Sequence, residues 1–120
     1  MMNKSIVWNY IDTEKATIKA MEDYKIMKKL HLLLSNDTDM SSDIHSFRNK
    51  RVKEYLEWFE PAWNYLDAEK RLILREFYMT GNLKSGAGIR LQFQLNYSER
   101  QLHRIRGRAI QELSMLLFAK

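Results

Sequence analysis

The chain has 120 residues, is 45% hydrophobic, and carries a formal net charge of +5 with four Gly, one Pro and no Cys. This length supports one compact core or a small domain with a helical arm, and the scarcity of turn-forming residues favours an all-α fold over a turn-dense β fold. The lack of Cys excludes disulfides, thiolate zinc sites and thiol nucleophiles, and the short apolar run Ile6–Trp8 is neither a signal peptide nor a membrane span, so we expect a cytoplasmic protein without membrane contact.

Positive charge is concentrated in the last third of the chain. From Leu83 onward there are seven Lys or Arg residues and two acids, whereas the preceding part holds 13 residues of each sign. This excess suits a polyanionic partner, and a merely solvated basic face is the alternative.

The first predicted helix begins at Asp12 or Thr13 and ends at Leu34. The apolar stripe of this helix needs a surface to pack against, which is either another part of the chain or a second copy. With a second copy, this helix would form a homodimer contact. Its apolar stripe consists of Ile18, Met21, Met27, Leu30 and Leu34.

A polar linker is predicted from Ser35 to Ser46. Its acids alternate as in a calcium loop, but the loop Gly and the closing Glu are missing, so we expect no metal and no other cofactor. The linker divides the chain into residues 1–46, an N-terminal helix and linker, and residues 47–120, a helical domain.

Two further helices are expected on either side of Pro61. Helical spacing predicts one helix from Phe47 to Glu60, after which Pro61 imposes a kink or a new helix start. The other helix is predicted to begin at Asp67, which caps it, and to end at about Met79. Aromatic residues on an amphipathic helix pack more often than they stack on bases. We therefore expect much of the core to come from Trp58, Phe59, Trp63 and Tyr65.

The glycine-rich stretch Thr80–Gly88 predicts a turn before the next helix. Lys84 and free backbone amides near Gly88 would there hold one DNA phosphate at a helix N-terminus.

A helix-turn-helix is predicted at about residues 88–113. A short helix from Ile89 to Leu95 is followed by the turn residues Asn96 and Tyr97, and Asn tolerates the left-handed backbone that a tight turn requires. Ser98 and Gln101 then form an S-x-x-Q capping box, which marks the start of the last helix.

The last helix has an apolar face and a basic face. Advancing 100° per residue from Leu102 gathers Ile105, Ala109 and Leu113 into a buried stripe and places Arg106 at its edge. Arg can bond guanine bidentately and Gln can bond adenine, so the opposite face suits the major groove, and Gly107 would let the backbone approach a duplex closely. The residues expected to contact DNA are Ser98, Glu99, Arg100, Gln101, His103, Arg104, Gly107, Arg108 and Gln111, with Lys84 from the preceding turn.

Three of these residues also have a simpler interpretation. Gln101 can be occupied by the helix cap, Glu99 can merely complement the helix dipole, and His103 can be an ordinary surface residue.

Two strings, Leu66–Tyr78 and Leu95–Leu113, resemble the fourth conserved region of bacterial sigma factors, a four-helix domain that binds promoter DNA. When the N-terminal residues Ile11-Asp12, Thr17 and the helix containing Tyr24 are considered as well, the chain is similar to the ArpU-like family of phage late-gene and autolysin regulators. The chain departs from the sigma-factor pattern in two places. Gln92 stands where the first helix of the helix-turn-helix usually has Ala, and the connection between Tyr78 and Leu95 is longer. The resemblance implies that the DNA-binding helix spans Ser98–Arg108.

These observations predict a sequence-specific transcription regulator that binds double-stranded DNA, with a phage or prophage late-gene activator as the implied role. The alternative is an adapter that engages RNA polymerase or another regulator and binds DNA little. We do not expect an enzyme, because no catalytic constellation or phosphate loop occurs at a useful spacing.

Overall fold

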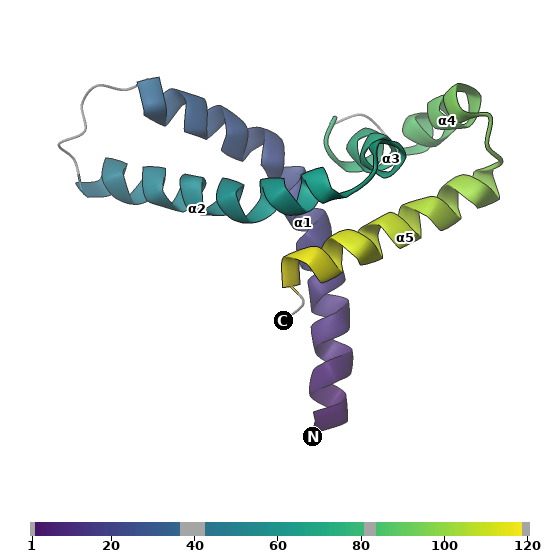
Figure 1. The fold of residues 1–120 in the computed structure, drawn as a ribbon, viewed down its shortest axis with the longest axis horizontal. Helices are drawn as coiled ribbons and strands as arrows, with labels where there is room; N and C mark the ends of the chain where they lie inside the picture. Colours follow the sequence, from purple (N-terminus) through teal and green to yellow (C-terminus); the bar gives the residue numbers. More distant parts are fainter. Residues whose placement is uncertain (1, 37–42, 81–83, 119–120) are drawn as a thin grey trace.

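The computed structural model describes residues 2–36, 43–80 and 84–118, and the side chains of residues 13–34, 47–80 and 86–118. Within these ranges every regular element is a helix, which confirms the all-α prediction. The helices are α1 (Met2–Asn36), α2 (Asp43–Tyr65), α3 (Ala68–Tyr78), α4 (Lys84–Leu95) and α5 (Glu99–Phe118) (Figure 1). None of the described helices has both the length and the apolarity needed to cross a membrane.

The helices form an open arrangement rather than a closed ball. The second half of α1 lies antiparallel beside α2, while its first half projects away past α5 (Figure 1). The radius of gyration is 17.0 Å, larger than the roughly 14 Å expected for a compact domain of this length. Most of the described side chains of α1, in residues 13–34, are exposed or partly exposed.

Two apolar clusters hold the helices together, and α5 contributes to both. The larger cluster joins α1, α2, α3 and α5 and includes Ala20, Met21, Phe59, Trp63, Leu74, Ala109 and Leu113. The smaller cluster joins α3, α4 and the start of α5 and consists of Ile73, Phe77, Ala87, Leu91 and Leu102. Because α5 belongs to both clusters, its orientation is fixed along most of its length.

α1 begins ten residues earlier than predicted. Residues 2–36 contain neither Gly nor Pro, so nothing in the sequence stops the helix near Asp12. Its most buried residues are Thr17, Ala20 and Met21, where it packs against α2 and α5. The Thr17 hydroxyl donates to the carbonyl of Thr13 at 2.6 Å, which satisfies this buried polar group.

The predicted linker is too long at both ends. α1 ends at Asn36 and α2 begins at Asp43, so Ser35–Asn36 and Asp43–Ser46 are helical. The side chains of the calcium-like alternation lie outside the described residues.

α2 continues through Pro61, so of the two outcomes predicted for this residue, a kink or a new helix start, the new start is wrong. Proline removes the amide that would bond the carbonyl of Glu57, but both residues are exposed, and water can satisfy that carbonyl. Tyr65, expected in the core, is 73% exposed. The buried positions are spaced three or four residues apart, and Leu66 occupies the place that follows Trp63.

Trp58 is also outside the core, but it has a structural role. Its indole N–H donates to the carbonyl of Leu117 at 3.1 Å. Its ring packs edge-on against the ring of Phe118, with the ring centroids 5.4 Å apart. These contacts attach the C-terminal turn of α5 to α2.

Asp67 caps α3 as predicted, because its side chain accepts from the amide of Lys70 at 2.9 Å.

Candidate nucleic-acid interface

α4 and α5 are joined by the three residues Asn96, Tyr97 and Ser98. Asn96 has a φ of 56°, so the predicted left-handed backbone of this turn is confirmed. Asn adopts this conformation more readily than other non-glycine residues.

The predicted capping box at the start of α5 is also confirmed. The amide of Gln101 donates to the Ser98 hydroxyl at 3.1 Å, and the amide of Ser98 donates to the Gln101 side-chain oxygen at 3.2 Å. The oxygen of Gln101 is therefore used by the cap, which favours the capping interpretation of this residue.

Tyr97 anchors the turn to α3, a role that sequence reasoning missed. Its hydroxyl donates to the Glu69 carboxylate at 2.8 Å, and this hydrogen bond raises the pKa of Tyr97 above its ordinary value. No local spacing signals this pair, because the partners are 28 residues apart.

The predicted apolar stripe of α5 packs inward. Leu102, Ala109 and Leu113 are buried and Ile105 is partly buried, with Ile110 and Leu117 joining them. A salt bridge between Lys70 and Glu112 further ties α5 to α3. The outward face is thereby directed to solvent.

All the DNA-contact candidates of the final segment lie exposed on or beside that outward face. They are Ser98, Glu99, Arg100, Gln101, His103, Arg104, Gly107, Arg108 and Gln111. Arg100, Arg104 and Arg108 are spaced four residues apart, so one guanidinium follows another at intervals of about 6 Å along the axis. Within the described part of the chain, these three arginines form no ion pair, and the row of charge is available to an anionic ligand.

Gly107 lies on this face with open space before it. Apart from its two neighbours and the nearby backbone of α5 itself, a Cβ built at this position would meet no described atom within 4 Å. Packing inside the molecule therefore does not require glycine here, although glycine in a helix interior costs roughly 1 kcal/mol relative to alanine.

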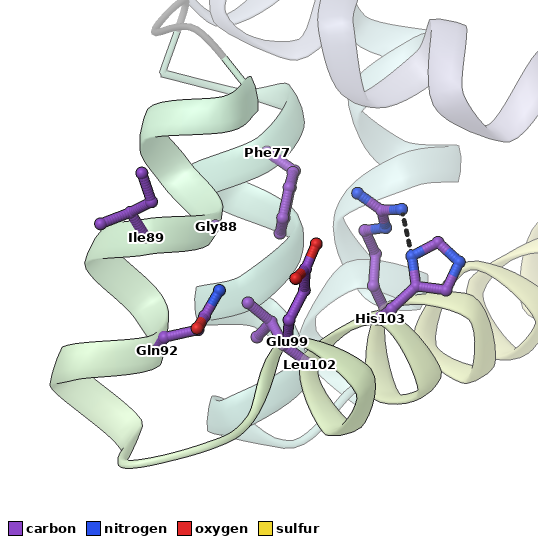
Figure 2. Close-up of a pocket in the computed structure, with 8 residues that line it drawn as sticks. Phe77, Gly88, Ile89, Gln92, Glu99, Leu102 and His103 are labelled. Carbon is purple, nitrogen blue, oxygen red and sulfur yellow. Dashed lines mark hydrogen bonds between the residues drawn. The ribbon is translucent and has the colours of Figure 1, made fainter.

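Arg106 has a different role from the neighbouring arginines. Its guanidinium lies 4.5 Å from the centre of the Phe77 ring, and its Nη2 donates to Nδ1 of His103 at 2.7 Å (Figure 2). Arg106 therefore braces α5 against α3, in agreement with its predicted place at the buried edge. The second ring nitrogen of His103 points away from this bond (Figure 2).

A cleft of about 460 Å³ lies between α3, α4 and α5, beside the outward face. Ile89 and Gln92 of α4 form one wall, and Glu99 and His103 of α5 form the other (Figure 2). Among the described residues, no group of His, Cys, Asp or Glu is arranged to hold a metal ion.

The predicted phosphate site before α4 needs correction. Lys84–Gly88 belong to α4 rather than to a turn, because Ala87 is fully buried and begins the apolar face that Leu91 continues. The amides that a helix leaves unbonded are those of its first turn, so Gly88 is too far inside α4 to supply one. The side chain of Lys84 lies outside the described residues.

No protein-family model, curated protein or solved structure gave a significant match to the chain.

Proposed function

We propose that the chain is a sequence-specific transcription regulator that binds double-stranded DNA through the outward face of α5. The observation that carries the proposal is the row of Arg100, Arg104 and Arg108 on a capped helix, with Gly107 exposed among them. Arginines on one helix face can bond phosphates and guanine edges, and a glycine lets the helix backbone approach the duplex. α4, the turn and α5 act as the helix-turn-helix in this proposal.

The resemblance to ArpU-like regulators extends the proposal to a phage or prophage late-gene activator in the cytoplasm. The local charge supports DNA as partner, since α5 carries five cationic residues or histidines on its exposed side and edge: Arg100, His103, Arg104, Arg106 and Arg108.

The test begins with selection of bound duplexes from a random pool by the purified full chain. Affinity for a selected duplex and for a random duplex is then measured over a salt series. Arg104, at the centre of the face, is replaced by Ala, and Lys53→Ala, an exposed cation on α2, is the matched control.

Arg104→Ala should weaken the selected duplex about tenfold or more and the random duplex less, because one bidentate base contact contributes about 1–3 kcal/mol of discrimination. Lys53→Ala should change neither affinity by more than about twofold. Equal losses on both duplexes would refute base readout, and failure of the wild-type chain to bind any duplex would refute the proposed function.

A second candidate is an adapter that engages RNA polymerase or another regulator. It is favoured by Phe93, which is 86% exposed, and by Ile89, one turn before it, which is 59% exposed where it borders the cleft. Exposed aromatic residues are common at protein interfaces. Co-purification with polymerase that is lost in Phe93→Gln, in a chain that shifts no DNA, would support the adapter instead.

A further inference from the structure

We infer that the groove between the second half of α1 and the first half of α2 binds an acidic amphipathic helix of a partner protein. This inference goes beyond DNA binding and concerns a different surface from the outward face of α5.

The groove has an apolar floor between two helices. Its volume is about 510 Å³; Met27, Leu30 and Leu34 of α1 line one side, and Val52 and Tyr55 of α2 line the other. Such a trough, walled by two helices, is the shape that receives the apolar face of a third helix.

The apolar surface also continues beyond the groove. Leu30 lines the groove and stands one turn from Ile26 and Leu33, each of which is 60% exposed. These three residues follow the i, i+4, i+7 spacing of an interacting helix face. The exposed apolar stripe therefore extends along about two turns of α1.

The charge around the groove indicates the sign of the partner. Arg48 and Arg51 lie among the described residues that line it, and no carboxylate does. On the other side of the exposed stripe, a second hollow is lined by Lys25 and Lys29, and by Lys28, whose charge is already paired with Glu60. Acidic residues on the edges of a bound helix would meet cations on both sides.

The same charges disfavour a second copy of this chain as the occupant. A copy that docked through the same half of α1 would bring Lys25 and Lys29 towards the partner's equivalent cations. Like charges opposed across an interface weaken association and suppress the wrong partner. Duplex DNA could pair with the arginines, but it has no apolar face to fill the floor.

The probe is a fluorescent 16-residue peptide with Leu at i, i+4, i+7 and i+11 and Glu or Ala elsewhere, titrated with the full chain by anisotropy. Saturable binding that weakens with salt is expected. Arg51→Glu should lower the affinity about tenfold or more by replacing attraction with repulsion. Lys53→Glu makes the same change of charge on α2 outside the groove and should have less than a twofold effect.

Leu30→Gln tests whether the apolar floor is needed for peptide binding. Circular dichroism checks that each variant keeps its helices. The Glu→Lys version of the peptide should not bind. Equal binding of both peptides, or equal effects of Arg51→Glu and Lys53→Glu, would overturn the inference. A dimer in light scattering that Leu30→Gln dissociates would assign the groove to a second copy, and binding to phosphatidylglycerol vesicles without peptide binding would assign it to a membrane surface.

Discussion

Replacing Gly107 with Ala separates the stability of α5 from the use of its outward face. In the free chain, the added Cβ would contact no described atom within 4 Å beyond its two neighbours and the nearby backbone of α5. Alanine is a better helix former than glycine, so the substitution should stabilise the fold by about 0.5–1 kcal/mol, equivalent to a rise in melting temperature of about 2–5 °C. Thermal unfolding followed by circular dichroism at the α-helical minimum measures this change.

The same methyl group should weaken DNA binding if the backbone of α5 lies against a duplex at Gly107. Inserting a methyl group into a closely packed contact costs about 1–3 kcal/mol, or about 5- to 150-fold in affinity. Stability and affinity should therefore change in opposite directions, which a general loss of folding cannot produce.

Asn49→Ala is the control for this experiment. It raises helix propensity inside α2, away from the outward face of α5. It should stabilise the chain slightly and leave DNA affinity unchanged. Gly107→Ala with a higher melting temperature and unaltered affinity would refute a close approach at this residue.

Substitutions at three other positions test separate parts of the structure. Asn96→Gly should preserve stability while Asn96→Ala lowers it by about 1 kcal/mol, because the φ of 56° is left-handed, and urea unfolding of the two variants checks this order. Arg108→Ala, at the edge of the outward face, should weaken selected and random DNA alike and reduce the salt dependence by about one phosphate contact, and a changed preference between duplexes would contradict this. Lys28 donates to Glu60 at 2.8 Å and, with the Tyr24 hydroxyl, lowers the pKa of Glu60. The ionised carboxylate therefore stabilises the fold above its ordinary pKa of 4.5, and this stabilisation is lost as the pH falls through its folded-state pKa. Because the pair is partly screened by solvent, Glu60→Gln should lower the free energy of unfolding in urea by about 1 kcal/mol at pH 7 and by progressively less below pH 4.

The sequence predicted the parts of the fold that local chemistry controls. The cap at Asp67, the box at Ser98 and Gln101, and the left-handed Asn96 each depend on residues within one turn, and the structure contains all three.

The errors arose where distant packing overrides local preference. Gly86 and Gly88 have low helix propensity, but the burial of Ala87 and Leu91 against α3 compensates for this loss of helix stability. Tyr65 and Trp63 are both large aromatic residues, and the direction in which α2 faces α1 and α5 decides that Trp63 is the buried one. The hydroxyl of Tyr97 and its partner Glu69 could not be paired from spacing either.

α5 is fastened near its start, in its middle and at its end. Tyr97 bonds Glu69 just before the helix, Lys70 pairs with Glu112, and Trp58 bonds the carbonyl of Leu117. A surface held in this way is preorganised, so a ligand of the outward face would lose little conformational entropy to ordering the helix. The heat-capacity change on binding should then report only the area that the ligand covers, without a contribution from coupled folding.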